Sequence, residues 1–251
     1  MTDNAVAQSV NIVKELGEGA GKVRAVDDVS VSIYPGELTL LMGPSGSGKT
    51  TLISMIGCIL SPTSGDVIIS GLSTKGLSPD ALARLRRQHI GFIFQSYNLF
   101  PTLNAIENVR LALDVRGMKG SVTRERSIEA LKSVGLGHRM KNYPRQMSGG
   151  EQQRVAVARA LAGSPSIILA DEPTAALDSE NGHGVMRLLR EIAHNEERSV
   201  LAVTHDHRTL SYADRILTIE DGHITGDKRG DADGGSEEQS HATERLKKTD
   251  A

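Results

Sequence analysis

The stretch GPSGSGKT at residues 43–50 decides the fold class. It fits the phosphate-loop pattern G-x-x-x-x-G-K-[ST] at every fixed position. The buried-strand run LTLLM at 38–42 precedes the loop, and the helical run TLISMIGCIL at 51–60 follows it. A glycine-rich turn without a ligand is the alternative, and the strand and helix on either side disfavour it. We therefore predict an α/β fold in which this loop joins a strand to a helix.

The loop is predicted to bind the phosphates of a nucleotide. Its glycines let backbone N–H groups face the phosphates, and the helix N-terminus adds the positive end of its dipole. Lys49 would neutralise the β- and γ-phosphates, and the Thr50 hydroxyl would ligate Mg²⁺. The predicted phosphate-binding residues are Gly43, Pro44, Ser45, Gly46, Ser47, Gly48, Lys49, Thr50 and Thr51.

Two adjacent carboxylates end the strand-like run SIILADE at 166–172. Asp171 would hold Mg²⁺ through its water shell, and Glu172 would orient or deprotonate the water that attacks the phosphate. A pair of exposed acids without such a role is the alternative, because acids after a strand are common. The phosphate loop elsewhere in the sequence favours the catalytic assignment. The pair predicts hydrolysis of the bound nucleotide.

Two further side chains follow predicted strands. His205 ends the strand in VTHD at 203–206, at the strand edge where α/β proteins bind ligands, and it could polarise the γ-phosphate and the water. Gln95 ends IGFIF and could reach Mg²⁺ or the water. The alternative for His205 is an ordinary surface or core residue, and for Gln95 it is an ordinary surface residue.

The stretch MSGGEQQRVAVARAL at 147–161 begins like a helix, because Ser148 and Glu151 have the spacing of a capping box. Gly149 and Gly150 fill its first turn. Each glycine costs a helix about 1 kcal/mol relative to alanine. We therefore predict that another group comes close to this backbone.

Composition restricts the classes of function. The chain has 251 residues, 38% of them hydrophobic, which suffices for a buried interior. Its 29 basic and 31 acidic residues give no net attraction to nucleic acid, so no direct nucleic-acid partner is expected. Apolar runs are too short to span a membrane, and the N-terminus does not resemble a secretory signal. The single cysteine, Cys58, agrees with a reducing compartment, and we expect it in the core.

Strand-like runs alternate with helical ones, which favours helices packed on a sheet. A half-buried strand is predicted at 29–33, and an Asp-Gly hairpin at 216–225. The predicted buried strands are 38–42, 67–69, 90–94, 167–170 and 200–204. Helical patterns replace strand patterns between Gln95 and Ser148, which predicts a helical insert. From Gly226 the chain has seven acidic and five basic residues but one large apolar side chain, so residues 226–251 are predicted to be a disordered charged tail.

GPSGSGKT, Gln95, SGGEQ, ILADE, AALD and His205, in this order, resemble the ATP-binding subunits of ABC transporters across residues 12–225. The resemblance implies a phosphate-loop NTPase of the ABC ATPase type with a mixed sheet core, a helical subdomain and an antiparallel β region. It divides an ATPase domain at 1–225 into a core (12–95 and 154–225) and a helical subdomain of about 96–153. ATP and Mg²⁺ are the implied cofactors.

The resemblance also implies a homodimer. Two copies would lie head to tail with two ATP molecules between them, and Ser148 with the amides of Gly149 and Gly150 would bind the γ-phosphate held by the other copy. Asp178 of AALD would also face across the dimer. This would explain the glycines, although Ser148 and Glu151 could form only a local capping box, and both interpretations can hold together.

The stretches around Gln95 and SGGEQQRVAVARAL look like the branch with lipoprotein-releasing (LolD-like), macrolide-exporting (MacB-like) and division (FtsE-like) ATPases. The implied partner is an FtsX/MacB-like membrane permease, whose cytoplasmic helix would fit against SYNLFPTL at 96–103. Tyr97, Leu99 and Phe100 suit such a contact, although each could equally serve the subdomain core. The protein would be cytoplasmic, peripheral on the inner face of the cell membrane, and would transmit motion for lipoprotein release or efflux.

Two alternatives keep the same site. One is an FtsE-like regulatory ATPase of a division complex, and the other is a soluble ABC ATPase acting on DNA or ribosomes. The long coiled-coil insertions and the second cassette typical of the soluble class are absent from the sequence. Three positions depart from the usual pattern: Met147 replaces Leu, Glu151 replaces Gln, and Leu16 stands where many relatives stack an aromatic on adenine.

Overall fold

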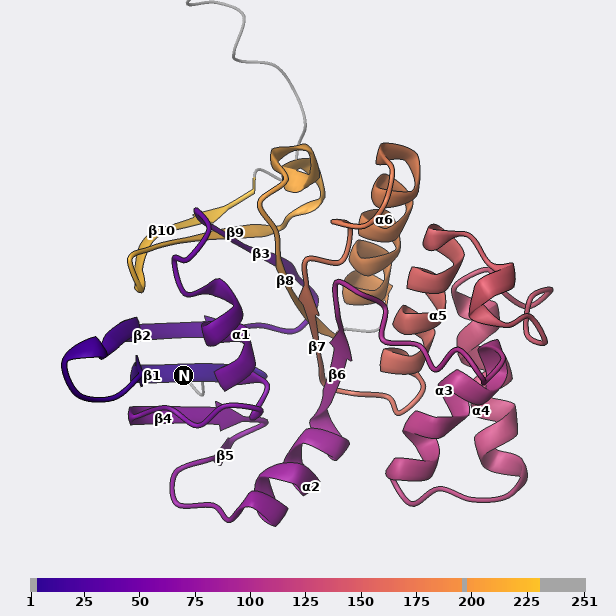
Figure 1. Ribbon diagram of the computed structural model, residues 1–251, viewed down its shortest axis with the longest axis horizontal. Helices are drawn as coiled ribbons and strands as arrows, with labels where there is room; N and C mark the ends of the chain where they lie inside the picture. Colours follow the sequence, from indigo (N-terminus) through magenta and orange to yellow (C-terminus); the bar gives the residue numbers. More distant parts are fainter. Residues whose placement is uncertain (1–3, 196–197, 231–251) are drawn as a thin grey trace, which may run out of the picture.

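The computed structural model describes residues 4–195 and 198–230, which form two sheets and a group of helices on one side of them (Figure 1). In chain order the elements are β1 (Ala7–Leu16), η1 (Gly19–Gly21), β2 (Val23–Ile33), β3 (Leu38–Met42), α1 (Lys49–Ile56), β4 (Ser64–Ile69), β5 (Leu72–Ser73), α2 (Pro79–His89), β6 (Ile90–Ile93), α3 (Ala105–Val115), α4 (Ser121–Ser133), η2 (Pro144–Gln146), α5 (Gly149–Leu161), β7 (Ile167–Asp171), α6 (Ser179–Asn195), β8 (Ser199–Val203), η3 (His207–Tyr212), β9 (Arg215–Glu220) and β10 (His223–Arg229).

The larger sheet has the strand order β10-β9-β3-β8-β7-β6. β3 pairs in parallel with β8 and β9, and β7 pairs in parallel with β8 and β6, while β10 is antiparallel. Every residue of β3 and β8 is buried, because helices and the second sheet cover both faces. The carboxyl ends of the parallel strands therefore meet at one edge, as the predicted site requires.

The second sheet is antiparallel, with the order β2-β1-β4-β5. Helix α1 lies between the two sheets and contacts β1, β2 and β4 on one side and β7 and β8 on the other. Its Leu52, Ile53 and Ile56 are each about 1% exposed and join the core between the sheets. The phosphate loop is thus supported from both sides, since the helix that follows it is held by two sheets.

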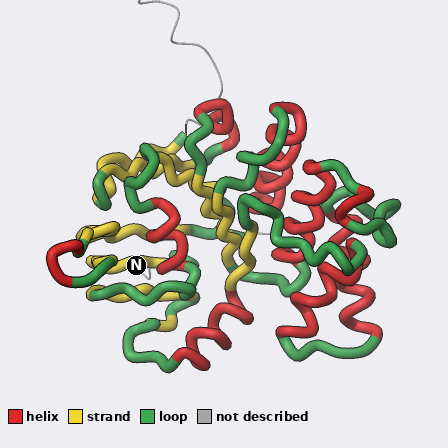
Figure 2. Tube along the Cα trace, viewed as in Figure 1, coloured by secondary structure: helices red, strands yellow, loops and turns green. Residues whose placement is uncertain are grey.

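Helices α3, α4 and α5 pack against one another beside the larger sheet (Figure 2). Asn104 and Glu107 form a capping box that starts α3. Helix α5 also contacts β6 and α6, so its apolar residues belong to the core of the larger sheet as well. It runs without a break through position 153, where we expected a boundary between subdomain and core.

Three expectations differ from the observed elements. Residues 67–69 were expected as a buried strand, yet burial alternates along them because β4 lies in the antiparallel sheet. Strand β1 begins at Ala7, before the expected start of the core at residue 12. Strand β10 continues to Arg229, so residues 226–229 are strand rather than tail, because they pair with β9. The rest of the expected tail, 231–251, lies outside the described residues.

Cys58 is 5% exposed, as expected for a core residue, and burial raises the pKa of its thiol to about 11. None of the helices in the described part of the chain has the length and apolar character needed to cross a membrane.

Candidate functional site

The phosphate loop connects β3 to α1, as the sequence predicts. Gly43 and Gly48 have positive φ values of 155° and 102°, and a side chain at either would collide with a backbone carbonyl, of Ile219 or Ala25. Gly46 also has positive φ, at 81°, but no atom lies within 4 Å of where its Cβ would be. The loop is therefore fixed at its two ends and leaves open space at its centre, as a phosphate-binding loop requires.

Two donors in the loop fit a phosphate group. Lys49 is 8% exposed, and its Nζ donates to the carbonyls of Gly43 and Pro44 at 2.8 and 2.6 Å. The buried Ser47 hydroxyl has no hydrogen-bond partner among the described residues. An ammonium group and an unpartnered hydroxyl on the same loop suit the oxygens of a triphosphate.

The loop borders an open cavity of about 920 Å³. Its lining comes from the β1–β2 connection, the phosphate loop, the ends of β6, β7 and β8, and the β9–β10 turn. The lining residues are Leu16, Val23, Arg24, Ala25, Gly43, Pro44, Ser45, Gly46, Gly48, Lys49, Thr50, Thr51, Gln95, Asp171, Glu172, His205, Asp221 and Gly222. The structure thus brings together every predicted phosphate-loop residue except the buried Ser47, together with the four side chains predicted at strand ends.

Asp171 and Glu172 end β7 at this cavity. The Thr50 hydroxyl donates to Oδ1 of Asp171 at 3.4 Å. Burial and the carboxylate of Glu172 raise the pKa of Asp171, and Thr50 and the charge of Lys49 offset the rise only in part. Glu172 has φ of 51°, and its N–H donates to the carbonyl of Val203 at 3.0 Å, which holds the carboxylate at the end of β8.

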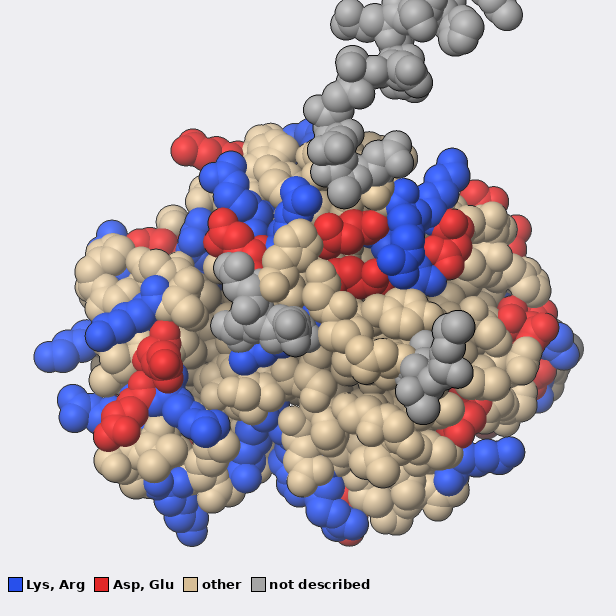
Figure 3. All heavy atoms as spheres, turned by 180° about the vertical axis from the view of Figure 1, so that it is seen from behind, with Lys and Arg blue, Asp and Glu red and all other residues tan. Residues whose placement is uncertain are grey.

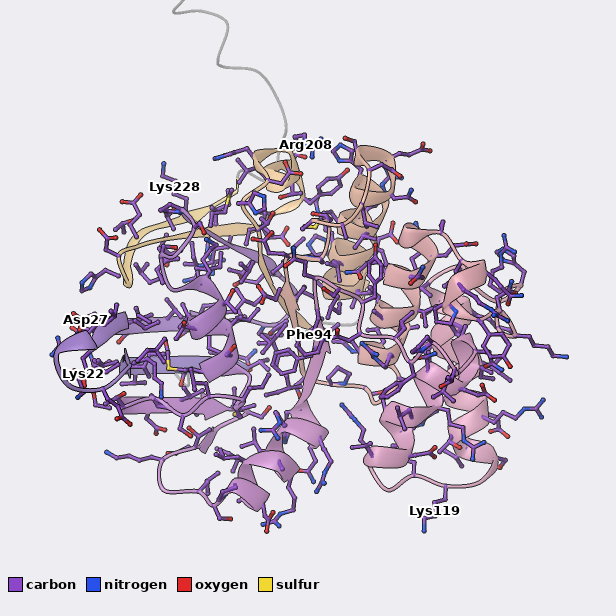
Figure 4. The ribbon with its side chains drawn as sticks, viewed as in Figure 1. Lys22, Asp27, Phe94, Lys119, Arg208 and Lys228 are labelled. Atoms are coloured by element: carbon purple, nitrogen blue, oxygen red, sulfur yellow. The ribbon has the colours of Figure 1, made fainter. Side chains whose placement is uncertain are left out.

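His205 follows β8 and lies against Glu172, with Nδ1 at 2.9 Å from Oε1. Gln95 follows β6, at whose end Phe94 lies (Figure 4). The rings of Phe92 and Phe94 stack with centroids 5.4 Å apart and 7° between their planes. The stacked rings support the end of β6, from which the exposed Gln95 leaves toward the cavity.

Mg²⁺, which the resemblance implies, fits the donors at this site. Across residues 4–195 and 198–230, no three His, Cys, Asp or Glu side chains cluster in a way that could hold a metal ion alone. The cavity instead presents the hydroxyl of Thr50, the carboxylate of Asp171 and the amide of Gln95. In phosphoryl-transfer sites, Mg²⁺ takes only a few of its oxygen ligands from the protein. Phosphate and water oxygens complete its coordination shell.

Residues 26–175 match the family described as ABC transporter. The chain belongs to this family. It is similar to the ABC transporter ATP-binding protein MJ0796 of Methanocaldococcus jannaschii, with 44% identity over 87% of this chain and 95% of the relative. It is also 45% identical to the macrolide export ATP-binding/permease protein MacB of Burkholderia pseudomallei, over 88% of this chain but 34% of MacB. The chain therefore spans about a third of the length of that relative.

Solved structures show the same architecture. A dimeric post-hydrolysis structure of the cassette MJ0796 bound to ADP and Pi aligns with a TM-score of 0.81, at 41% identity, over 89% of this chain and 98% of that one. CbiO1 of Clostridium perfringens, part of the complex cbiONQ, aligns with the same TM-score at 25% identity, over 90% and 89% of the two chains. The predicted fold is confirmed: this chain is an ABC-type ATPase with a mixed core sheet, an antiparallel sheet and a helical part.

The other predicted nucleotide-binding residues of this ABC ATPase lie away from the cavity. Ser148, Gly149, Gly150 and Asp178 do not line it. The capping box of α5 is present, with Ser148 Oγ accepting from the N–H of Glu151 at 3.2 Å and Glu151 Oε2 accepting from the N–H of Ser148 at 2.9 Å. These hydrogen bonds lower the pKa of Glu151. The carboxylate therefore points into the cap.

The glycines of α5 have close neighbours within the same chain. A Cβ on Gly149 would lie 2.9 Å from the hydroxyl of Tyr97, and one on Gly150 would collide with Oδ1 of Asn181. Asn181 in turn donates from its N–H and Nδ2 to Asp178, at 2.9 and 2.8 Å. The predicted close approach to this backbone is present. One of the groups that come close is Asn181 of α6, which belongs to the same chain and not to a nucleotide.

Sequence reasoning missed several lining residues, namely Val23, Arg24, Ala25, Asp221 and Gly222. Val23 is the partner of Leu16 across the β1–β2 pair, and the two are 63% and 43% exposed. An exposed apolar pair at the mouth of a nucleotide site suits the flat face of a base. Only strand pairing reveals this pair, because its members are seven positions apart in the sequence.

The segment proposed to meet a permease is partly exposed. Phe100 is 50% exposed, whereas Leu99 packs partly against the core of the larger sheet, and the Tyr97 hydroxyl donates to the carbonyl of Ala176 at 3.3 Å. Of the three side chains, Phe100 thus keeps the most apolar surface for a partner.

Proposed function

We propose that this chain is the ATP-hydrolysing subunit of a MacB-like transporter of the lipoprotein-release or efflux type. Two copies would close head to tail on Mg²⁺-ATP and would drive a membrane permease from the cytoplasmic face of the cell membrane. The observation that carries this proposal is the separation of two surfaces. One surface holds the phosphate loop with Asp171 and Glu172, and the other holds Ser148, Gly149 and Asp178.

Each side chain of the cavity has a role in hydrolysis under this proposal. Lys49 would turn from the loop carbonyls to the β- and γ-phosphate oxygens, and Thr50 and Asp171 with Gln95 would hold Mg²⁺, which neutralises charge developing on the phosphates. Glu172 would orient the attacking water and accept its proton, and His205 would contact the γ-phosphate. Ser148, Gly149, Gly150 and Asp178 would come from the second copy.

The dimeric MJ0796 structures and the MacB relatives support this proposal. The helical part, about 96–153, would carry Phe100 toward the permease. On the upper part of the face shown in Figure 3, Lys and Arg are interspersed with Asp and Glu, and such a mixed arrangement does not favour a nucleic-acid backbone.

Mixing two inactive variants tests the head-to-tail arrangement. Lys49→Ala should lose triphosphate binding, and Ser148→Arg should block capping of the nucleotide on the other copy. In a mixed dimer, one site combines both defects and the other is intact. Turnover should therefore reappear on mixing, up to about a quarter of the wild-type rate if assembly is random and the sites are independent. Mixtures as inactive as their components would overturn the arrangement.

Co-purification in detergent tests the partner. ATP turnover should rise when the membrane subunit that co-purifies with the chain is present, and that subunit should bind lipoproteins or efflux substrates. A partner that activates cell-wall hydrolases would instead support the FtsE-like alternative. A turnover that responds to DNA or ribosomes and to no membrane protein would contradict the transporter assignment.

A further inference from the structure

A hollow of about 620 Å³ lies between α5 and α6, apart from the nucleotide cavity. We call it the α5–α6 hollow, and it is lined by Arg154, Glu180, Asn181, His183, Gly184, Arg187 and Tyr212. Gly184 leaves room for the guanidinium of Arg154, because a Cβ there would lie 3.0 Å from Nη2 of Arg154. The hollow therefore exposes charge contributed by two different helices.

The charge in this hollow is only partly balanced. Within the described ranges, neither Arg154 nor Arg187 forms an ion pair with a carboxylate; Arg154 donates to the carbonyl of Val134 at 3.2 Å. His183 contacts the hydroxyl of Tyr212 at 3.1 Å through Nδ1, and Glu180 is the one acidic lining residue. Two guanidinium groups facing one carboxylate favour an anionic ligand with more than one carboxylate.

The described chain ends next to the residues that follow η3, the segment whose last residue, Tyr212, lines this hollow. The N–H of Gly230 donates to the carbonyl of Asp214 at 2.8 Å, two residues beyond Tyr212 of the hollow. The carboxylate of Asp214 lies 2.8 Å from His194 and 3.9 Å from Arg190, both on α6. The polypeptide therefore leaves the described structure near the C-terminal part of α6, beyond the residues of this helix that line the hollow.

Side chains of α6 form a basic row that passes this exit. His183, Arg187, Arg190 and His194 are spaced i, i+4, i+7 and i+11, so they share one face of the helix. Asp214 already neutralises the end of the row near the exit, and among the residues that the structure describes Arg187 is the next cation along the row without an ion pair. Figure 4 shows Arg208 of η3 near the upper end of α6, and its Nη1 donates to the hydroxyl of Ser179, the first residue of α6, at 2.7 Å.

The sequence that follows Gly230 is DADGGSEE, residues 231–238. It contains four carboxylates and no basic residue. Eight residues span at most about 28 Å when extended, which is the length of about five helical turns. A tethered segment also has an effective local concentration in the millimolar range, so weak ion pairs suffice for binding.

We propose that residues 231–238 bind in cis in the α5–α6 hollow, with their carboxylates paired to Arg187 and Arg154. The bound segment joins α5, which begins with Gly149, to α6, which follows Asp178. Occupancy of the hollow therefore holds together the two helices that carry the dimer-facing residues.

Zero-length carbodiimide coupling tests the contact in the full chain. An Arg187→Lys variant keeps the charge and supplies an amine that couples only to a carboxylate in contact with it. Mass spectrometry should find a bond between position 187 and a carboxylate in 231–238. The bond should disappear when Asp231, Asp233, Glu237 and Glu238 are changed to Asn or Gln, and it should weaken severalfold at about 1 M salt, where screening acts within about 3 Å.

Arg87→Lys is the matched control, because Arg87 is an exposed arginine of α2 on another part of the molecule (Figure 1). The proposal would be overturned if residues 231–238 couple to Lys at position 187 no more often than they couple to Lys at position 87. Mixing heavy-isotope and normal protein separates cis from trans, and bonds found mainly between copies would also overturn it.

The effect on turnover rests on the proposed function and is measured separately. If the bound segment restrains α5 against α6, the variant with the four neutralised carboxylates should hydrolyse ATP at least twofold faster than wild type. If this variant loses the cross-link to position 187 but hydrolyses ATP at the wild-type rate, the segment binds in the hollow but does not restrain the two helices. If mixing Lys49→Ala with Ser148→Arg restores no turnover, the head-to-tail dimer is refuted. The cross-linking result at position 187 does not depend on that outcome.

Discussion

Nδ1 of His205 lies 2.9 Å from Oε1 of Glu172 and 2.8 Å from its Oε2, so a single ring nitrogen engages both carboxylate oxygens. An ionised carboxylate can only accept, so Nδ1 carries the proton in this contact. Under the proposed mechanism a water molecule needs one of these oxygens. Because an ionised carboxylate has about four lone-pair sites, Glu172 keeps acceptor capacity for this water while His205 holds the carboxylate in place.

Replacing Glu172 by Gln keeps the shape of the side chain and removes the base. We expect ATP affinity within about twofold of wild type and turnover lower by about 10²–10⁴-fold, the range for a lost general base. Nucleotide titration and phosphate release measure the two quantities, and light scattering should show a dimer that persists with ATP. Unchanged turnover would contradict the role of Glu172.

Removing the ring of His205 should slow turnover through the same step. His205→Ala is expected to lower turnover by at least about tenfold, because one contact to the γ-phosphate is lost. In the double variant with Glu172→Gln, the losses should not add, since both residues act on the same water and phosphate. Single-turnover phosphate release on the four proteins gives the comparison. Additive losses would show that the observed contact has no part in the chemistry.

The raised pKa of Asp171 has a cost in stability. The pKa of Asp171 is higher in the folded chain, so its carboxyl ionises at lower pH in the unfolded chain than in the folded one. Ionisation therefore destabilises the folded state, and this loss of unfolding free energy is complete above the folded pKa. Asp171→Asn should therefore raise the melting temperature of the nucleotide-free protein at pH 7, because the variant has no carboxylate to ionise in the folded state. The gain should shrink as pH falls through the raised folded pKa and should vanish by about pH 3, below the unfolded value of about 3.9, where the carboxyl is protonated in both states.

Calorimetry of both proteins at the two pH values checks this sign. Mg²⁺ with ATP should stabilise wild type more than Asp171→Asn, because a ligand that binds the carboxylate stabilises the folded state. A melting temperature that falls in the variant at pH 7 would mean that the carboxylate is favourable without its ligand.

Gly150 separates two explanations for the glycines of α5. Gly150→Ala brings a Cβ onto Oδ1 of Asn181, so we expect a loss of about 1–3 kcal/mol in unfolding free energy, typical of overpacking. Adding Asn181→Ala should restore most of that loss, and Asn181→Ala alone gives the baseline. If stability returns but ATP turnover does not, the glycine also serves a nucleotide on another copy. If both return, internal packing alone explains Gly150.

The sequence predicted the elements whose signals are local. GPSGSGKT with its flanking runs specified β3, the loop and α1, and the apolar runs before Gln95, Asp171 and His205 specified the strands that bring these side chains to one edge. The Ser148–Glu151 spacing specified the cap of α5. In each case the signal lies within a few residues of the feature it specifies.

What the sequence missed depends on contacts between distant segments. Val23 reaches the cavity because it pairs with Leu16, and Gly150 is restricted by Asn181, which comes from another helix. Residues 226–229 looked like tail because they are polar, yet β9 pairs with them, and main-chain pairing along an edge strand needs no apolar side chain. Composition measures side chains alone and so could not place the end of β10.

Asn108 is a further residue that only the structure identifies, and it gives the sharpest stability test. It is fully buried in α3; its Oδ1 accepts from the N–H of Phe100 at 2.8 Å, and its Nδ2 lies 3.2, 2.8 and 3.0 Å from the carbonyls of Phe100, Leu103 and Asn104. Asn108→Ala should lower the unfolding free energy by about 3 kcal/mol, because it leaves main-chain groups unpaired in the interior. Asn104→Ala, at the exposed cap of the same helix, should cost about 1 kcal/mol and is the control. Denaturant unfolding of the two variants measures both losses of unfolding free energy, and equal losses would show that water replaces the amide of Asn108.

Asn108 also holds the segment that carries Phe100. Asn108→Ala should therefore lower the stimulation of ATP turnover by the permease more than it lowers basal turnover.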